Sequence, residues 1–158
     1  MSTLTPLSPA ELHALAQTHA REPGGLLPLL HAVQDRMGFI PPESVGDIAR
    51  AFNRSRAEVH GVISFYHHFR SAPAGRHVVQ LCRAEACRAC GSEALAAVAE
   101  QALGCASGDT SAGGVTLESV YCLGLCASSP AIAVDGEPQA RMSEARLQQL
   151  LQELEAQP

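Results

Sequence analysis

The sequence has no tryptophan, and aromatic residues make up only 4% of its 158 residues. Its formal net charge of −5 disfavours binding to nucleic acid or to an anionic membrane, since both are negatively charged. The longest apolar runs are far shorter than the roughly 20 residues of a transmembrane helix. We therefore expect a globular protein without nucleic-acid binding or direct membrane insertion, whose core consists mainly of leucine, valine and alanine.

Signals of several other functions are also missing. Residues 1–11 contain no basic segment followed by an apolar one, so no secretory signal is expected. Six cysteines without such a signal predict a reducing, cytoplasmic location, where clustered cysteines bind metals or carry out redox chemistry more often than they form disulfides. The sequence lacks a G-x-S-x-G motif, a P-loop, a Rossmann fingerprint and an H-E-x-x-H motif, and we predict no catalytic residues.

The first half of the chain has the periodicity of helices. Four short helices are predicted within residues 1–74 as an N-terminal helical bundle, after a loose tail at residues 1–7. Capping boxes at Ser8–Glu11 and Ser55–Glu58 mark the starts of the first and fourth helices. The second helix is predicted over Leu26–Met37.

The periodicity changes after a small, polar segment at residues 71–75, which we interpret as a linker between domains. Residues 75–158 are predicted to form a second domain with the element order β-α-β-β-β-α, which makes the chain an α+β protein. The expected strands are 77–81, 115–121, 131–134 and 139–142, and the expected helices are 91–103 and a last one that follows Ser143.

Two pairs of cysteines directly follow two of the predicted strands. Cys82 and Cys87 form a C-x4-C motif, and Cys122 and Cys126 form a C-x3-C motif. Loops that leave strands at the same edge of a sheet can meet, so the two pairs can close on one centre. Thiolate sulfur is a soft ligand that suits iron–sulfur clusters, zinc or Cu(I), and the spacing therefore predicts a thiolate-bound metal centre.

Spacing alone leaves iron–sulfur and structural zinc open. Zinc sites favour C-x2-C pairs, and only Cys87–Cys90 offers one here. Cys90 and Cys105 are interpreted as inert thiols, as buried free cysteines commonly are. Arg83 and Arg88 flank the first pair and are candidates to offset the charge of a thiolate-bound cluster.

Two features outside the cysteine motifs invite functional interpretations. His67 and His68 lie in an aromatic run and are interpreted as caps of an aromatic cluster at a domain junction, rather than as metal ligands. Residues 47–59 resemble a helix-turn-helix, which makes a DNA-binding redox regulator an alternative function. Glu58 and the scarcity of cations in the second of these helices argue against that alternative.

The cysteine motifs also carry a resemblance to a known family. On the predicted β-α-β-β-β-α frame, Cys82-x4-Cys87 and Cys122-x3-Cys126 resemble the thioredoxin-like [2Fe-2S] ferredoxins. Ahead of that frame, Gly38-Phe39-Ile40-Pro41 and the segment 59–66 resemble the 24 kDa subunit of respiratory complex I and its relatives. Those relatives include small diaphorase subunits of NAD-reducing hydrogenases and the gamma subunit of NAD-dependent formate dehydrogenase. The resemblance extends from about Leu26 to Met142.

The resemblance implies a fold, a cofactor and partners. It implies a thioredoxin-like domain with one [2Fe-2S] cluster held by Cys82, Cys87, Cys122 and Cys126 in an electron-transfer subunit. The segment 82–87 is most similar to the formate dehydrogenase gamma subunit, so that complex is favoured over complex I and NAD-reducing hydrogenase. FMN, NAD and further clusters are then expected only on partners, namely a flavin- and NAD-binding diaphorase subunit and a larger catalytic subunit of the molybdenum or tungsten type.

Overall fold

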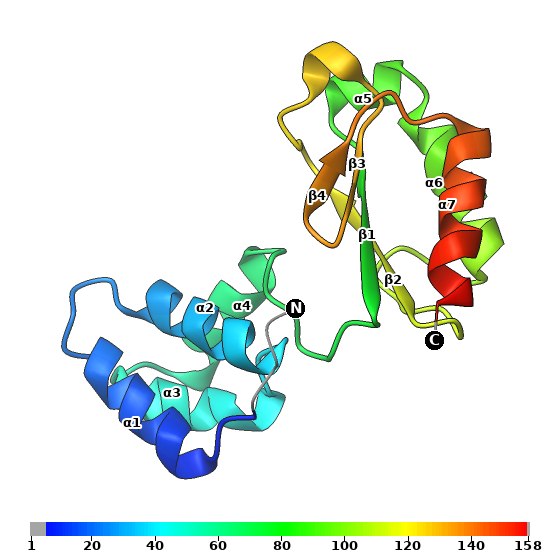
Figure 1. The fold of residues 1–158 in the computed structure, drawn as a ribbon. Coiled ribbons are helices and arrows are strands. Elements are labelled where there is room, and N and C mark those ends of the chain that lie inside the picture. Colours follow the sequence, from blue (N-terminus) through cyan, green and yellow to red (C-terminus); the bar gives the residue numbers. More distant parts are fainter. Residues whose placement is uncertain (1–5, 158) are drawn as a thin grey trace. The chain divides into compact units, whose positions relative to one another are not determined.

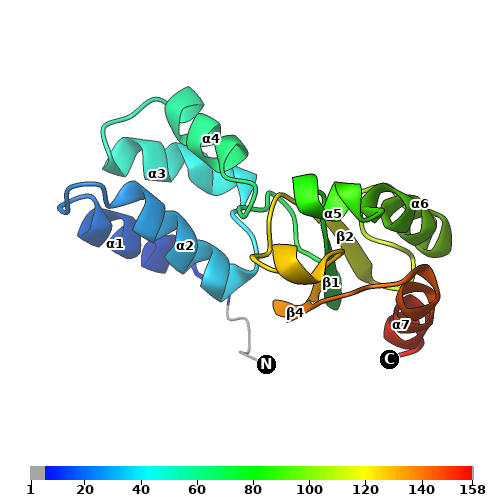
Figure 2. The ribbon, with the colours of Figure 1, turned by 90° about the horizontal axis from the view of Figure 1, so that it is seen from above.

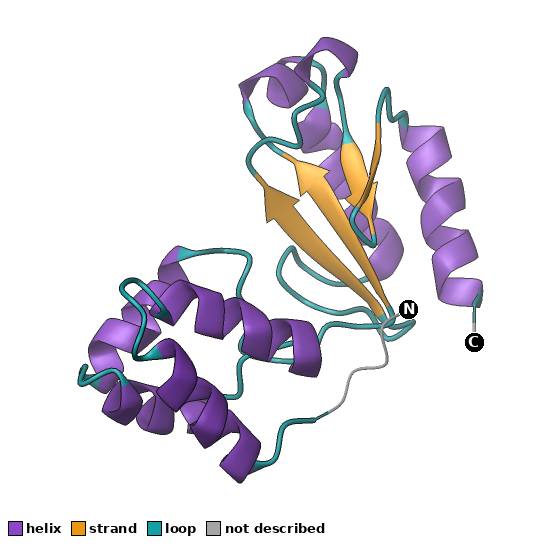
Figure 3. Ribbon diagram, turned by 60° about the vertical axis from the view of Figure 1, so that its left-hand side comes forward, coloured by secondary structure: helices purple, strands orange, loops and turns teal. Residues whose placement is uncertain are grey.

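The computed structural model describes residues 6–157 as two compact units, the first ending at Pro73 and the second starting at Ala74. The first unit is helical, and the second contains the sheet (Figure 1, Figure 3). Among the described residues, no helix has the length and hydropathy that would let it cross a membrane.

The first unit begins its helices where the sequence predicts. Its elements are α1 (Pro9–His19), α2 (Leu26–Met37), the 3₁₀ turn η1 (Pro42–Ser44), α3 (Val45–Ala51) and α4 (Arg56–Phe65). Ser8 accepts a hydrogen bond from the backbone N–H of Glu11, and the Glu11 carboxylate accepts one from the Ser8 N–H. Ser55 and Glu58 repeat this arrangement at α4. Both capping boxes are confirmed, and they satisfy N–H groups that a helix start leaves unpaired.

The core of the first unit is formed by aliphatic side chains from all four helices, among them the fully buried Leu29, Ile48 and Val59. Leu7 also belongs to this core and is only 8% exposed. The prediction of a loose tail over residues 1–7 is therefore wrong at Leu7, because its side chain has apolar partners in the bundle. The same prediction for residues 1–5 lies outside the described part of the chain.

The second unit is built on a four-stranded mixed sheet. Its elements are β1 (His77–Cys82), α5 (Glu85–Ala89), α6 (Ser92–Leu103), β2 (Val115–Val120), the 3₁₀ turn η2 (Cys126–Ser128), β3 (Ile132–Val134), β4 (Glu137–Gln139) and α7 (Glu144–Ala156). The strand order is β2-β1-β3-β4, with β1 and β2 parallel and the other neighbours antiparallel. The predicted α+β class is thus confirmed, with α5 as an additional short helix.

The helices α6 and α7 lie side by side and cover one face of the sheet (Figure 1, Figure 2). Alternate residues of β1, such as Val79 and Leu81, point into the core between the helices and the sheet. In the parallel pair, Cys82 stands beside Val120, so β1 and β2 end level with each other. The segments that follow these two strands therefore leave the sheet at the same edge.

The fourth strand lies earlier than the sequence analysis placed it. β4 covers Glu137–Gln139, and the predicted strand at 139–142 is wrong except for its first residue. Asp135 and Gly136 form a two-residue hairpin turn with positive φ angles, which sets Val134 opposite Glu137. The chain therefore resumes pairing at once, and it tolerates Pro138 because β4 is an edge strand.

Candidate metal centre

The first cysteine segment continues directly from the core of the second unit. Cys82 is the last residue of β1, and Cys87 lies on the short helix α5. Both side chains are buried, each with 2% exposure. The Cys82 backbone N–H donates to the Ala131 carbonyl, and the Arg83 N–H donates to the Val120 carbonyl. These bonds fix the start of the segment to the strands on both sides.

The second cysteine segment is a loop that faces outward. Cys122 and Cys126 are both exposed, and their sulfur atoms lie 3.8 Å apart. Cys122 has a φ of 110° and Gly124 a φ of 77°. A positive φ is strained for a residue with a side chain, and such strain is common where a protein positions a functional group. The Gly124 N–H donates to the Cys122 sulfur at 3.4 Å.

Backbone donors of the second segment reach the first one. Burial would raise the pKa of the Cys82 thiol, but hydrogen bonds outweigh it and leave that pKa lowered. The donors are the N–H groups of Ala84, Leu123 and Cys122, together with the Cys87 thiol. Two of these N–H groups come from the second loop, so a negative sulfur at Cys82 is stabilised by both segments.

The pKa of Cys126 is affected by each of the other three thiols of the two segments. Its pKa is raised, first by the hydrogen bond with Cys122, then by the charge of Cys122, by burial, and by the charges of Cys87 and Cys82. Neighbouring thiolates repel one another, and a bound cation would relieve the repulsion. The structure thus packs the loop of Cys122 and Cys126 against the buried Cys82 and Cys87, and the role of the four cysteines as ligands stays a prediction.

A small apolar cluster lies beneath the sulfur atoms. Cys82, Cys87 and Ala131 are its buried members, and Leu123 and Leu125 of the second loop pack against them with Ala84 and Val120. The alternation of leucine with cysteine in the loop explains this packing, because Leu123 and Leu125 turn inward where Cys122 and Cys126 turn outward. The thiols of Cys82 and Cys87 are therefore shielded from water, whereas those of Cys122 and Cys126 remain exposed.

The other predicted site residues are placed differently. Arg83 donates to Glu93 from Nη2 at 2.5 Å and from Nε at 3.2 Å, and Arg88 lies 3.5 Å from the same carboxylate. The two arginines thus share one acidic partner on α6. Cys90 is exposed, because α5 ends there and turns it toward solvent, so its interpretation as an inert thiol gains no support from burial. Cys105 is half-buried, and burial raises its pKa.

The two histidines of the aromatic run lie in the first unit. The ring of His68 stands 5.3 Å from that of His31 and 6.0 Å from that of Phe69, measured between centroids. The Nδ1 atom of His67 lies 3.1 Å from the Phe65 carbonyl oxygen. His68 therefore belongs to an aromatic cluster, as the sequence analysis expected.

Within residues 6–157, no three His, Cys, Asp or Glu side chains form a site for a single metal ion.

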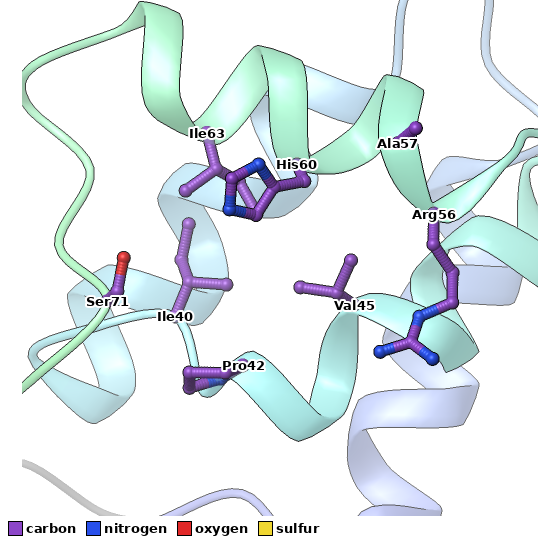
Figure 4. A pocket seen from close by; sticks show the side chains of 8 residues that line it. All are labelled: Ile40, Pro42, Val45, Arg56, Ala57, His60, Ile63 and Ser71. Atoms are coloured by element: carbon purple, nitrogen blue, oxygen red, sulfur yellow. The ribbon is translucent and has the colours of Figure 1, made fainter.

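The helical unit carries a hollow of its own. Its lining consists of Ile40, Pro42, Val45, Arg56, Ala57, His60, Ile63 and Ser71 (Figure 4). The floor is mostly aliphatic, and the lining includes no cysteine or carboxylate. In the same region, Arg50 pairs with Asp47 and Arg54 pairs with Glu58, which neutralises two of the cations that a DNA-binding helix-turn-helix would present.

The fold and the thiols together define a class of protein. A small α+β unit with two cysteine pairs that follow neighbouring parallel strands is typical of proteins with a thiolate-bound metal centre. Comparison with known sequences then gives the family, since the profile of the thioredoxin-like [2Fe-2S] ferredoxins matches residues 12–155. The chain belongs to the thioredoxin-like [2Fe-2S] ferredoxin family.

Individual relatives have similar length. NADH-quinone oxidoreductase subunit 2 of Thermus thermophilus is 35% identical over 149 residues, which cover 90% of this chain and 82% of the relative. Another NADH-quinone oxidoreductase subunit, from Rhizobium meliloti, is 33% identical, with 92% and 88% covered. A solved structure of an air-oxidized NAD+-reducing [NiFe]-hydrogenase matches with a TM-score of 0.68 and 25% identity over 84% of this chain. This chain spans only 23% of that hydrogenase chain.

The family implies a [2Fe-2S] cluster, and the residues present fit one. Such a cluster needs four thiolates, two for each iron, and the structure offers its thiols as two pairs. Backbone N–H groups already point to the sulfur atoms, and they stabilise negative charge there. The donor set and its hydrogen bonds thus suit an iron–sulfur cluster.

Proposed function

We propose that this chain is the electron-transfer subunit of an NAD-linked, multi-subunit oxidoreductase, with Cys82, Cys87, Cys122 and Cys126 as the ligands of its [2Fe-2S] cluster. The observation that carries the proposal is the contact between the two cysteine segments, in which Leu123 and Leu125 pack against the buried Cys82 and Cys87. The proposal includes two domains, a helical one over 1–74 and a cluster-binding one over 75–158.

The residues around the thiols have separate tasks in this proposal. When bound, the cluster supplies one-electron transfer. The N–H groups of Leu123 and Gly124 donate to thiolate sulfur and favour its negative charge. Leu123 and Leu125 keep water away from the inner side of the site. All-cysteine ligation favours a low potential, nearer to about −400 mV than to the Rieske range.

The exposed side of the site suits electron exchange with a partner. Cys122 and Cys126 lie at the surface, and Tyr121 beside them is 68% exposed. Tyrosine is enriched at protein–protein interfaces, so this face suits the docking of a partner. Partners that fit are a flavin- and NAD-binding diaphorase subunit and a larger catalytic subunit, with FMN, NAD and further clusters bound by them.

Among the possible parent complexes, formate dehydrogenase is our first candidate. It rests on the resemblance of Cys82-Arg83-Ala84-Glu85-Ala86-Cys87 to the gamma subunit of the NAD-dependent enzyme, whose catalytic subunit would hold molybdenum or tungsten. The names of the relatives support a second candidate, NADH:quinone oxidoreductase, and the hydrogenase structure supports a third. All three keep the same task for this chain.

Native, anaerobic purification through a tag on this chain tests the proposal. The recovered complex is assayed for NAD reduction by formate, for NAD reduction by hydrogen, and for quinone reduction by NADH. Formate activity together with a molybdenum- or tungsten-bearing subunit supports the first candidate. Hydrogen or quinone activity instead assigns the chain to a sister complex. A colourless chain recovered alone with stoichiometric zinc would overturn electron transfer.

A further inference from the structure

Ser129 is the hydroxyl that touches both cysteine segments. Its Oγ lies 3.5 Å from the sulfur of Cys87, which belongs to the first pair. The same Oγ donates to the backbone carbonyl of Cys126, in the second pair, at 2.9 Å. Ser129 directly follows η2, and its φ of −64° and ψ of 156° are the extended values favoured before a proline. The backbone thus holds the hydroxyl between the two segments.

We propose that Ser129 is a positioning residue that tunes the reduction potential of the centre by donating a hydrogen bond to the Cys87 sulfur. The inference rests on the proposed function, because it requires Cys87 to be a ligand. Its basis is that 3.5 Å is within the range of a hydrogen bond to sulfur, on a side of Cys87 that is buried.

The hydrogen bond between Cys87 and Ser129 must change direction when Cys87 becomes a ligand, because Cys87 then loses its proton. In the free thiol, Cys87 has a proton of its own to donate to Ser129, whose hydroxyl proton goes to the Cys126 carbonyl. A ligand thiolate has lost its proton and can only accept. The single hydroxyl proton of Ser129 then turns from the carbonyl to the sulfur, which is the stronger, negatively charged acceptor.

The sign of the effect follows from charge. Reduction adds one negative charge to the centre, and part of it resides on the ligand sulfur atoms. A hydrogen bond to sulfur therefore stabilises the reduced state more than the oxidised state and raises the potential. Without the hydroxyl, the centre should be harder to reduce.

The test compares Ser129→Ala, Ser129→Thr and Ser128→Ala in the full, cluster-loaded chain. Redox titration followed by EPR gives the midpoint potential, and resonance Raman spectra in H2O and D2O report hydrogen bonding at the Fe–S bonds. We expect a lower potential and a smaller deuterium shift for Ser129→Ala. The Thr variant keeps the hydroxyl and should retain both, and Ser128→Ala removes a neighbouring hydroxyl with neither contact and should change nothing.

The outcomes separate this inference from the function it builds on. A Ser129→Ala chain with an intact cluster, an unchanged potential and an unchanged deuterium shift would overturn it. Faster loss of the cluster at an unchanged potential would also overturn it, since it would show that the hydroxyl only holds the Cys126 loop. Wild-type chain that binds no [2Fe-2S] cluster would instead overturn the proposed function.

Discussion

The two cysteine segments follow parallel neighbours in one sheet, yet they present their thiols in opposite ways. Cys82 and Cys87 are buried against the sheet, whereas Cys122 and Cys126 are exposed on a loop with a strained backbone. In the proposed centre, two of the ligands would therefore lie in the core of the second unit and the other two at its surface. The buried half fixes position, and the exposed half is where a partner can approach.

The prediction with the largest expected effect concerns the role as ligands that all four cysteines would share. If each of the four cysteines is a ligand, replacing any one by serine should abolish or grossly alter the rhombic EPR signal of the reduced cluster. Cys122→Ser and Cys87→Ser should therefore be equally damaging, despite the difference in exposure. Iron content and EPR of each purified, reduced variant measure this.

Cys90 supplies the matched control for this comparison. It lies three residues after Cys87 and is exposed, but it is outside the proposed ligand set. Cys90→Ser should keep one cluster per chain with an unchanged signal. A normal signal in Cys122→Ser, or a lost one in Cys90→Ser, would refute the ligand assignment.

The second prediction measures the difference in exposure directly. After the cluster is removed by a chelator, iodoacetamide should label Cys122 and Cys126 at least about tenfold faster than Cys82 and Cys87. We expect burial to outweigh the lowered pKa of Cys82 and the raised pKa of Cys126, which alone would favour labelling of Cys82. Labelling of a buried thiol requires local opening, and about 1.4 kcal/mol of opening free energy already slows it tenfold. Mass spectrometry of peptides resolves the four rates, with the exposed Cys90 as an internal reference.

This ratio decides whether the two halves differ in solution. Equal rates for the two pairs would mean that the first segment opens as readily as the second. The contrast between a core half and a surface half would then not hold in the cluster-free chain.

The third prediction concerns the backbone of the exposed loop. Gly124 has a φ of 77°, and an added Cβ would meet no atom within 4 Å. Gly124→Ala should therefore destabilise the unit through backbone strain alone, by about 1–2 kcal/mol. Urea unfolding of the cluster-loaded chain gives this value. The EPR signal should also change, because the Gly124 N–H donates to the Cys122 sulfur.

Gly104→Ala is the control that distinguishes the effect of backbone strain from the effect of closeness to the cysteines. The φ of Gly104 is 63°, and a Cβ there also meets nothing within 4 Å, but it ends α6 and contacts no cysteine of the centre. Gly104→Ala should cost a similar free energy and leave the EPR signal as it is. If Gly124→Ala left both stability and signal unchanged, the loop would not need its left-handed turn.

Much of this fold was predictable because the apolar residues that become buried recur in the sequence with the periods of helices and strands. The helix at Leu26–Met37 and the capping boxes at Ser8 and Ser55 follow from local rules that the structure obeys. The short helix α5 was missed, since five residues give no full period to detect. The fourth strand was misplaced because Pro138 disfavours a strand, whereas an edge position permits it.

The sequence predicts that the two cysteine segments meet, and the ligand assignment stays a prediction. The difference in burial between the two pairs was not predictable. Two cysteine pairs after two strands indicate convergence at a sheet edge. The burial of each pair depends on non-periodic contacts, such as the packing of Leu123 against the cluster of Cys82 and Cys87, and on the positive φ of Cys122. The hydroxyl of Ser129 left no signal either, because its closeness to Cys87 arises only in three dimensions.

The prediction with the smallest expected effect concerns the ion pairs that hold the first cysteine segment. Arg83 and Arg88 pair with Glu93, and the second segment, Cys122–Cys126, has no charged residue. The hydrogen bond from Arg83, and then the charges of both arginines, lower the Glu93 pKa. A carboxyl group whose pKa is lower in the folded state than in the unfolded state stabilises the fold at pH values above the ordinary glutamate pKa. This stabilisation is lost as the pH falls through the lowered pKa.

Glu93→Gln should therefore be less stable than the wild type at pH 7, and the difference should vanish as the pH falls below about 4. The pair is exposed and solvent-screened, so the effect is expected to be small. Urea unfolding of the reduced, cluster-free chain between pH 7 and pH 3 measures it.

Glu144→Gln is the matched control, because Glu144 also lies in the first turn of a helix, α7, and experiences its dipole. A larger pH dependence for Glu93 than for Glu144 would isolate the share of the arginines, and equal dependence would show that the first segment is held by burial alone.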